Sequence, residues 1–388
     1  TIYSDNTDYS SQQVPHITFF KNGYGNALLT AVATPFPNMK GYGLYSSDNC
    51  FKDCSQLTSI PAELFKYNAQ ITSFTGCFEN CTRLASIPAE LFKYNTEAKE
   101  FTQCFRKCTG LSSIPAELFK NNTKVTDFSS CFDMCSGLTA IPADLFKYNG
   151  LAEDFEYCFR KCAGLTEIPA GLFDNNTAAI NFKGCFCYCT ELTAIPAGLF
   201  DKNTAAANFE GCFNSCSKLT AIPAGLFDKN TVATNFNRCF LFCTGLTGAN
   251  AIPADLFKYN TEATSFFACF NGCTELTTLP NNLFLYNKKA TDFRYCFLNC
   301  TKLELRADIF PMPTGSFSQP DFFNDRAMDF TGFCKNVGTA ATTQGTAPEL
   351  WRFNYGAGVT STDCFTGITT NLTNYNDIPA SWGGPAAP

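Results

Sequence analysis

The chain repeats one phrase of 27 residues, and this repeat restricts the possible folds more than any other feature. A cysteine pair with the spacing C-F-x-x-x-C returns along the chain, with first cysteines at positions 50, 77, 104, 131, 158, 185, 212, 239, 269 and 296. The step is 27 residues except before Cys269, where Gly248, Ala249 and Asn250 lengthen it to 30. Such an insertion in a fixed period predicts a loop that bulges from one coil of a stacked array.

The unusual composition follows from this repeat. The consensus F-x-x-C-F-x-x-x-C-x-x-L-T-x-I-P-A-x-L-F-x-x-N contains three phenylalanine columns, and these hold 29 of the 41 phenylalanines. A unit of 27 residues is too small to bury so many large side chains alone, whereas stacked copies bury them in one continuous core. The sequence therefore predicts a solenoid.

Local patterns within the repeat predict a mixed α/β coil. L-T-x-I alternates apolar and polar residues and favours a short strand, which the following proline ends because it has no N–H. T-x-F favours a second short strand, and both are expected to pair in parallel with their copies in neighbouring coils. A-x-L-F-x-x-N and C-F-x-x-x-C each favour one helical turn. The asparagine column suits either a left-handed turn or side-chain bonding to the backbone.

The repeat also predicts the domain organisation. About ten coils occupy residues 45–310. Residues 1–44 lack the repeat, and we expect them to cover the first coil as an N-terminal cap. Residues 311–388 contain degenerate copies around "DFTGFCKN" and "DCFTG", which indicates a C-terminal cap.

The repeated phrase resembles a known family. "CSGLTAIPADLFKYN" followed by "DFEYCFRKC" is similar to the BspA-like leucine-rich repeat of surface proteins of gut and oral Bacteroidetes, over about residues 45–310. The tail, with Cys364-Phe365 and Ile378-Pro379, is similar to the closing module of such proteins. Repeats of this type often carry a small residue in place of the first cysteine, so the doubled cysteine is a departure. The resemblance implies a leucine-rich-repeat solenoid that is secreted or displayed on the outer cell surface and binds macromolecules.

Three interpretations of the cysteine pairs remain open. A structural metal site needs four ligands, and the only histidine is His16, outside the repeat. Within one helical turn the two Cβ atoms lie roughly 5–6 Å apart, too far for a disulfide, although a bridge between neighbouring coils is possible. Cysteine is also a small apolar residue that is often buried. We expect packed thiols, with neither a metal nor a cofactor.

Catalysis and nucleic-acid binding are not indicated. A cysteine nucleophile needs a base nearby, and we expect His16 to be an ordinary loop or cap residue. The sequence contains no GxSxG or HExxH motif and no glycine-rich phosphate loop. The net charge of −6 and pI near 5.0 disfavour binding to phosphates. No apolar run has the roughly 18 residues that would predict a transmembrane segment. We therefore expect a protein that is not an enzyme.

Positions that change from coil to coil are where a binding surface would be encoded. The two columns after "LF" carry mainly lysine and tyrosine, and the two positions between the cysteines are basic in some coils and apolar in one. Tyrosine is a frequent contact residue, although an ordinary solvent-exposed ridge would have the same composition. The candidate binding face comprises Lys66, Tyr67, Lys93, Tyr94, Lys147, Tyr148, Tyr259, Tyr286, Arg106, Lys107, Arg160, Lys161, Leu241 and Phe242.

These observations favour a binding or adhesion protein that recognises protein or glycan through variable columns. From the resemblance we expect an extracellular or outer-surface location, after removal of a signal sequence that preceded Thr1. The competing class is a structural protein that self-assembles into a fibre or surface layer through its ends or flanks.

Overall fold

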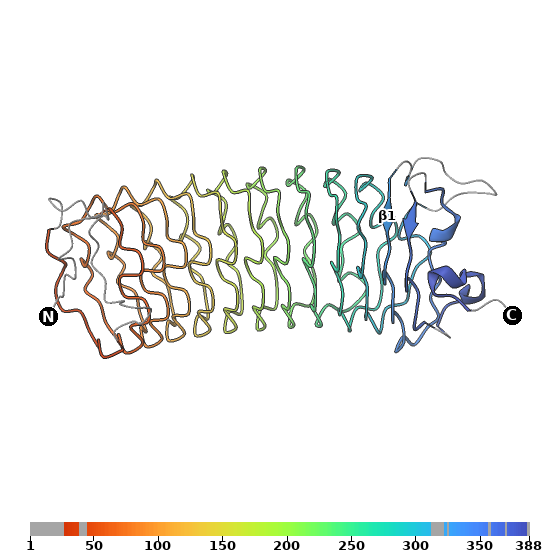
Figure 1. The fold of residues 1–388 in the computed structure, drawn as a ribbon, viewed down its shortest axis with the longest axis horizontal. Helices are drawn as coiled ribbons and strands as arrows, with labels where there is room; N and C mark the ends of the chain where they lie inside the picture. The colour runs from red at the N-terminus through yellow and green to blue at the C-terminus, as the bar shows by residue number, and fades with distance from the viewer. Residues whose placement is uncertain are drawn as a thin grey trace, which may run out of the picture. The chain divides into compact units, whose positions relative to one another are not determined.

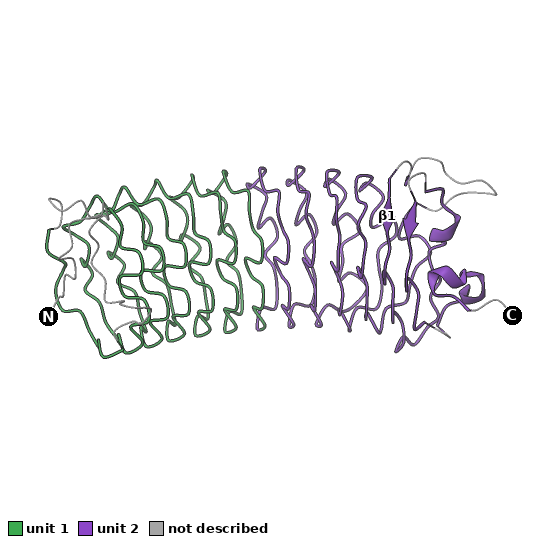
Figure 2. Ribbon diagram, in the orientation of Figure 1, with its two compact units in different colours: residues 1–190 green, residues 191–388 purple. Residues whose placement is uncertain are grey.

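The computed structural model describes residues 27–38, 45–311, 322–323, 326–355, 358–368 and 371–385. The chain divides into two compact units, residues 1–190 and 191–388 (Figure 2). In each unit the backbone winds into successive coils that stack on one another, seen as the repeated loops in Figure 1. The predicted solenoid architecture is therefore confirmed within each unit. Most of the predicted N-terminal cap, including His16, lies outside the described residues.

Regular secondary structure is sparse, and all of it lies in unit 2. Within the described residues, the strands are β1 (Met328–Asp329) and β2 (Val359–Thr360), which pair in parallel. The helices are the short 3₁₀ segments η2 (Leu350–Arg352), η3 (Tyr375–Asp377) and η4 (Ala380–Trp382). Figure 1 labels the β1 strand.

Of the two strands predicted in each coil, one is reduced to a single bridge residue, and the other is present in the described repeated coils only as the bridge of Ser59 with Ala31. In the T-x-F segment, isolated parallel bridges join successive coils, for example Ser73 to Glu100 and Glu100 to Asp127. In the L-T-x-I segment, single hydrogen bonds join neighbouring coils, from 2.9 Å between the N–H of Glu304 and the carbonyl of Thr277 to 3.5 Å between the N–H of Ser112 and the carbonyl of Ala85. The proline that follows has no N–H to extend this pairing.

The predicted helical turn at C-F-x-x-x-C is replaced by an alternating hydrogen-bond pattern. The N–H of Cys104 donates to Phe101 in its own coil (3.0 Å), and the N–H of Phe105 donates to Cys131 in the next coil (2.9 Å). The residue before each cysteine of a pair has a positive φ, such as 60° at Lys107. A left-handed residue cannot continue a right-handed helix. Each residue with a positive φ therefore interrupts the helical turn that the sequence predicts for this segment.

The phenylalanine columns form the core and show how the coils are spaced. We call F-x-x-C-F-x-x-x-C the cysteine segment and A-x-L-F-x-x-N the LF segment. Rings of the two segments meet across the core, as where Phe119 lies 4.9 Å from Phe128. Phe105 and Phe132, in the cysteine segment, are 5.6 Å apart, whereas Phe119 and Phe146, in the LF segment, are 6.2 Å apart.

The same difference holds in both units. From Phe200 to Phe284 the LF rings are 6.1–6.3 Å apart, whereas from Phe213 to Phe297 the rings of the cysteine segment are 5.6–5.7 Å apart. Neighbouring coils of each unit therefore lie farther apart at their LF segments than at their cysteine segments. The cysteine segments lie on the inner side of this curvature, the side on which repeat proteins present extended binding surfaces.

The buried asparagine column joins one coil to the next. Asn122 donates two hydrogen bonds through Nδ2, to the carbonyl oxygens of Phe92 (3.1 Å) and Asn95 (2.8 Å). Asn149 repeats this arrangement one coil later, at 3.2 and 2.9 Å. Of the two roles predicted for this column, the structure shows side-chain bonding to the backbone.

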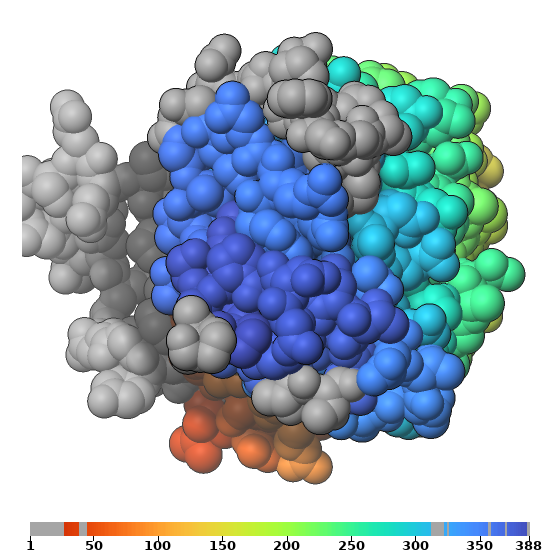
Figure 3. Space-filling model, turned by 90° about the vertical axis from the view of Figure 1, so that its right-hand side faces the viewer, coloured from red at the N-terminus to blue at the C-terminus, as the bar shows by residue number. Residues whose placement is uncertain are grey.

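Residues outside the repeat pack on the first and last coils. In unit 1, Phe36 stacks on Phe51 with ring centres 5.6 Å apart, and Asn68 donates to the carbonyl of Pro37 (3.0 Å). In unit 2, Phe330 stacks on Phe293 of the last coil, with ring centres 5.5 Å apart, and the N–H of Phe365 donates to the carbonyl of Trp382 (2.9 Å). Figure 3 shows the end of unit 2 covered by this last part of the chain, in the darkest blue. The division into a solenoid and two caps stays a prediction.

Candidate macromolecule-binding surface

The cysteine pairs belong to the core. All 23 cysteines are buried thiols that form no disulfide. The second cysteine of a coil donates its Sγ–H to a phenylalanine carbonyl of the preceding coil, from Cys108 to Phe78 and from Cys135 to Phe105, both at 3.2 Å. In the part of the chain that the structure describes, no group of three or more His, Cys, Asp or Glu side chains could hold a metal ion. This geometry favours packed thiols over disulfides.

Cys187 lies outside the paired pattern, in the position that follows C-F, and is also buried. Burial raises the pKa of its thiol to about 12, although the nearby Arg160 and Lys161 act in the opposite direction. Nucleophilic cysteines need a thiolate near neutral pH, so Cys187 is protonated and unreactive in the folded chain.

The lysines and tyrosines after "LF" form a ridge on the wider side of the coils, which we call the tyrosine ridge. Lys66 Nζ lies 2.8 Å from the carboxylate of Glu63 and 5.9 and 5.6 Å from the ring centres of Tyr67 and Tyr94. The hydrogen bond from Lys66 lowers the pKa of the Glu63 carboxyl. Tyr94 also donates its hydroxyl to Glu63 (2.9 Å). The ridge is thus held in place by contacts within and between coils.

Other candidate residues of the ridge have the same environment. Lys93 pairs with Glu90 at 2.8 Å, and Lys147 pairs with Asp144 at 3.4 Å. The exposed tyrosines of the ridge, with their exposed fractions, are Tyr67 (51%), Tyr148 (39%), Tyr259 (45%) and Tyr286 (45%). The tyrosine rings are therefore the part of the ridge that remains open to a partner, because the ammonium groups beside Glu90 and Asp144 are already paired.

A paired exchange along the ridge was missed at the sequence level. Where aspartate replaces the lysine after "LF", glycine replaces the acidic residue three positions earlier. Gly171 has a φ of 74°, and a β-carbon there would lie 3.1 Å from a carboxylate oxygen of Asp174. Each coil with lysine after "LF" therefore also carries an acidic residue three positions earlier, so the lysine adds no net positive charge to the ridge. Comparing the two columns together, instead of one column alone, would have shown this.

Alternating charges form a second row, on the cysteine segments of unit 1. This charge ladder consists of Lys52, Glu79, Arg106, Asp133 and Arg160, each at the same position of successive coils. Successive members are separated by 2.8, 2.6, 3.1 and 2.7 Å. The side chain of Asp133 is fully buried, and its hydrogen bond raises the pKa of Arg160.

The ladder changes how two candidate residues are interpreted. Arg106 and Arg160 are paired with carboxylates of neighbouring coils and are about three-quarters buried at the side chain, with exposed fractions of 25% and 27%. The acidic partners Glu79 and Asp133 were not identified from the sequence. The change of sign at every step of the repeat was the signal that could have identified them.

The remaining candidate residues also lie on cysteine segments. Lys107 and Lys161 make no ion pair among the described residues, and Lys161 Nζ lies 5.7 Å from the ring centre of the exposed Tyr188. In unit 2, Leu241 is half-buried. Phe242 is 48% exposed and has a φ of 57°.

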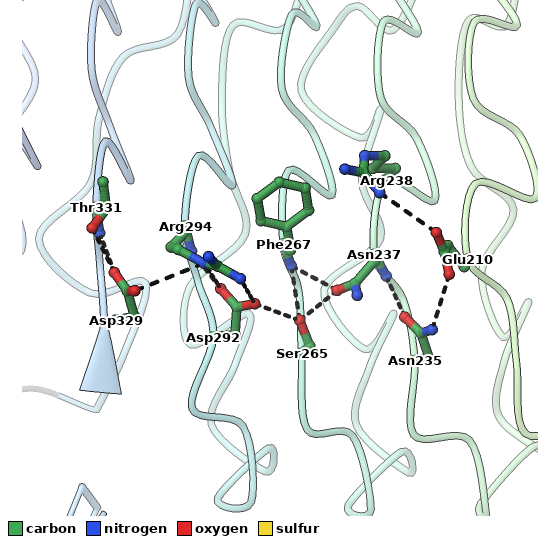
Figure 4. Close-up of polar contacts among 10 residues, drawn as sticks. All are labelled: Glu210, Asn235, Asn237, Arg238, Ser265, Phe267, Asp292, Arg294, Asp329 and Thr331. Carbon is green, nitrogen blue, oxygen red and sulfur yellow. Dashed lines mark hydrogen bonds and ion pairs between the residues drawn. The ribbon is translucent and has the colours of Figure 1, made fainter. Parts of the chain in front are cut away.

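A polar network on the cysteine segments of unit 2 contains further residues that sequence reasoning did not select. Phe267 lies between two guanidinium groups, with Arg238 at 4.5 Å and Arg294 at 5.0 Å from its ring centre. Figure 4 shows these side chains with the hydrogen bonds that link their coils. Asn237 Oδ1 accepts the N–H of Phe267 (3.0 Å) and fixes its backbone.

Comparisons with known proteins show distant similarity. No family model and no curated protein matches the chain. A chain of the Toll–Spätzle complex of Drosophila is 19% identical, with a TM-score of 0.43, and the match covers 74% of this chain and 36% of that one. A leucine-rich repeat protein from Bacteroides ovatus is 16% identical, with a TM-score of 0.31, covering 78% of this chain and 93% of that one.

A leucine-rich cell surface protein from Faecalibacterium prausnitzii is 18% identical, with a TM-score of 0.28, covering 68% of this chain and 81% of that one. At these scores the fold assignment rests on the coils themselves, which make each unit a leucine-rich-repeat-like solenoid. Proteins of this fold often bind other proteins or act at surfaces, and are typically not enzymes. Among the described helices, none has the length and apolar character needed to cross a membrane.

Proposed function

We propose that this chain is a non-enzymatic binding protein, secreted or on the outer cell surface, that adheres to protein or glycan through its outward-facing columns. One observation carries this proposal. The cysteine segment combines an interior that is the same in nearly every coil with outward positions that differ from coil to coil. The residue before the second cysteine, for example, is Lys107, Met134, Lys161, Ser215 or Phe242.

The backbone that presents these side chains is rigid. The N–H of Lys107 donates to Asp133 of the next coil (2.7 Å), and the N–H of Phe242 donates to Asn271 (2.8 Å). Preorganised side chains lose little conformational entropy on binding, which favours affinity. A constant frame with varied outward positions is suited to recognition of an extended partner.

The proposed binding residues form two separate surfaces, on opposite sides of the coils. The first is the tyrosine ridge, where Tyr67, Tyr148, Tyr259 and Tyr286 offer exposed rings. The second is the inner surface of the cysteine segments, with Lys107, Lys161, Leu241 and Phe242 exposed or half-buried and with Arg106 and Arg160 held by the charge ladder. Aromatic and arginine side chains supply much of the binding energy at protein interfaces.

The repeat supplies its own control substitutions for a test. Arrays of glycans and of extracellular proteins would be probed with the whole chain and with two variants. A ridge variant carries Tyr67→Asn and Tyr148→Asn, since Asn121 occupies this column naturally. A segment variant carries Lys107→Met and Lys161→Met, since Met134 occupies that column.

The proposal predicts a partner in at least one array and at least about a tenfold loss of affinity in one variant, with melting temperatures unchanged. Absence of any partner in both arrays would overturn it. Sedimentation velocity on the same preparations tests the competing class. A monomer is expected, and concentration-dependent filaments would favour self-assembly into a fibre or surface layer.

A further inference from the structure

One stretch of unit 1 is positively charged, although the chain as a whole carries a net charge of −6. Between the paired cysteines of four successive coils, from Cys104 to Cys189, stand four cationic side chains and a single carboxylate, Asp133. That carboxylate is fully buried and is shared by Arg106 and Arg160, at 3.1 and 2.7 Å. Positive charge therefore remains in excess on the outward side. We define the basic strip as Arg106, Lys107, Met134, Arg160, Lys161 and Tyr188.

The outward residues of the strip form a row because their backbones repeat one conformation. The position before the second cysteine is occupied in successive coils by Lys107, Met134, Lys161 and Tyr188, whose φ values are 60°, 63°, 58° and 61°. The N–H groups of the first three each donate to the next coil at 2.7 Å. Lys161 Nζ lies 5.7 Å from the ring centre of Tyr188. The backbone beneath the strip thus fixes these side chains at the spacing of the coils.

The two lysines are the open charges of the strip. Lys161 is exposed and Lys107 is half-buried, and neither has an ion pair in the part of the chain that the structure describes. The charge ladder does not cancel them, because it contains three cations and only two carboxylates, Glu79 and Asp133. The strip therefore offers two unpaired ammonium groups, two coils apart, and the exposed ring of Tyr188 in the following coil.

The backbone of the strip is already bonded, which disfavours a peptide as the ligand. The carbonyl of Lys107 accepts the N–H of Thr109 (2.8 Å), and that of Met134 accepts the N–H of Ser136 (2.9 Å). Extended peptides are recognised largely through main-chain hydrogen bonds or apolar pockets, and Met134 is the one aliphatic side chain of the strip. A polysaccharide fits better, because it repeats its charged groups at a fixed interval and packs the C–H faces of its rings on aromatic rings.

We propose that the basic strip binds an acidic polysaccharide. Carboxylate or sulfate groups of the polysaccharide pair with the ammonium groups of Lys107 and Lys161, and one sugar ring packs on Tyr188. The two arginines stay in the charge ladder and add to the positive field. Binding is strongest at low ionic strength, because salt screens exposed charges. This inference rests on the proposed binding function and names the class of glycan.

The test measures binding of the whole chain to three immobilised polysaccharides: heparin, which is sulfated, polygalacturonate, whose charges are all carboxylates, and neutral dextran. At least one of the first two should bind, more weakly as salt is raised, and the stronger of them identifies the preferred anion. Lys107→Met combined with Lys161→Met should lower the affinity at least about tenfold, and Tyr188→Ser at least about threefold. Met134 and Ser215 occupy this column naturally, so the melting temperatures should not change.

A matched control removes two positive charges elsewhere in unit 1. Lys120→Met combined with Lys124→Met should bind as the parent chain does, because these lysines lie outside the strip and are paired with Glu117 and Glu97 at 2.8 and 2.6 Å. An equal loss of affinity in this control would show that net charge alone drives binding, and would overturn the inference.

Three other results would also overturn it. They are the absence of binding to both acidic polysaccharides, equal binding to dextran, and equal competition by polyglutamate, which would make the partner an acidic peptide. A partner found in the arrays whose affinity is unchanged by the lysine substitutions would remove the strip but leave the proposed function standing.

Discussion

The ring of Phe242 lies across Gly272, the residue at the same position of the next coil, so that a β-carbon on Gly272 would collide with it. The ring of Tyr295, which directly precedes Cys296, lies over Gly332 in the same way. In unit 1, Tyr157 lies over Gly184. At these three positions a large side chain with a positive φ is accommodated by glycine in the following coil.

A double-mutant cycle tests this relationship. Gly272 has a φ of 72°, so Gly272→Ala is expected to lower the free energy of unfolding by roughly 1–2 kcal/mol through backbone strain and by about 1–3 kcal/mol more through the collision. In a Phe242→Asn background only the strain remains. Urea unfolding of the four chains measures the coupling. Equal losses in both backgrounds would show that the ring does not press on this position.

The charge ladder predicts a large effect from one substitution. Asp133→Asn leaves Arg106 and Arg160 without their shared carboxylate, and loss of one partner of a buried pair costs roughly 3–5 kcal/mol. Because both arginines are partly exposed, we expect about 2 kcal/mol in unfolding experiments. Glu90→Gln, at an exposed pair with Lys93, is the control and should change stability by less than about 1 kcal/mol. Similar effects of the two substitutions would contradict a supporting role for the ladder.

The asparagine column depends on donors rather than acceptors. Asn122 Nδ2 donates to two backbone carbonyls, whereas its Oδ1 has no hydrogen-bond partner among the described residues. Asn122→Asp keeps the shape but replaces the donors with a carboxylate, so it should destabilise the chain by at least about 2–3 kcal/mol. Thermal unfolding compares it with Asn122→Ala. A near-neutral Asn122→Asp would disprove the assigned role.

Burial of the thiols predicts loss of stability at alkaline pH. It raises the pKa of Cys187 and Cys300 from an ordinary 9.0 to about 12, and shifts the pKa of many other repeat cysteines in the same direction. Below about pH 8 nearly all of the thiols are neutral in both states, and their stabilising contribution is fully present. Between pH 9 and 12 the unfolded chain releases protons that the folded chain retains.

In this window each such thiol removes about 1.4 kcal/mol of stability per pH unit. The melting temperature, followed by circular dichroism with a reductant present, should be flat from neutral pH to about 8, begin to fall between about pH 8 and 9, and fall steeply above that. A flat profile up to about pH 11 would contradict burial of neutral thiols.

Much of the fold could be predicted because the repeat constrains it. The cysteine and phenylalanine columns, among them Cys104, Phe105 and Phe119, are buried as the solenoid requires. The local conformations could not be predicted, because hydrogen bonds between coils override local preference. Lys107 shows this, since its φ of 60° follows from its place between two stacked turns and not from its residue type.

The candidate surface was less predictable. Exposure of Tyr67 and Phe242 follows from their variable columns, but the pairing of Arg160 with Asp133 depends on a residue one coil earlier. Arg238 and Phe267 lie in different columns and meet only because adjacent coils stack. Predicting such contacts requires knowledge of the distance between coils, which the sequence pattern alone does not give.

The central claim is that the repeated cysteines are neutral core thiols, so that function lies in the outward columns. Titration with a thiol reagent tests it most directly. The folded chain, without reductant, should react at very few sites. In denaturant all 23 cysteines should react. A denatured chain with few reactive thiols would show that the cysteines are oxidised or bound to metal, and would contradict the account.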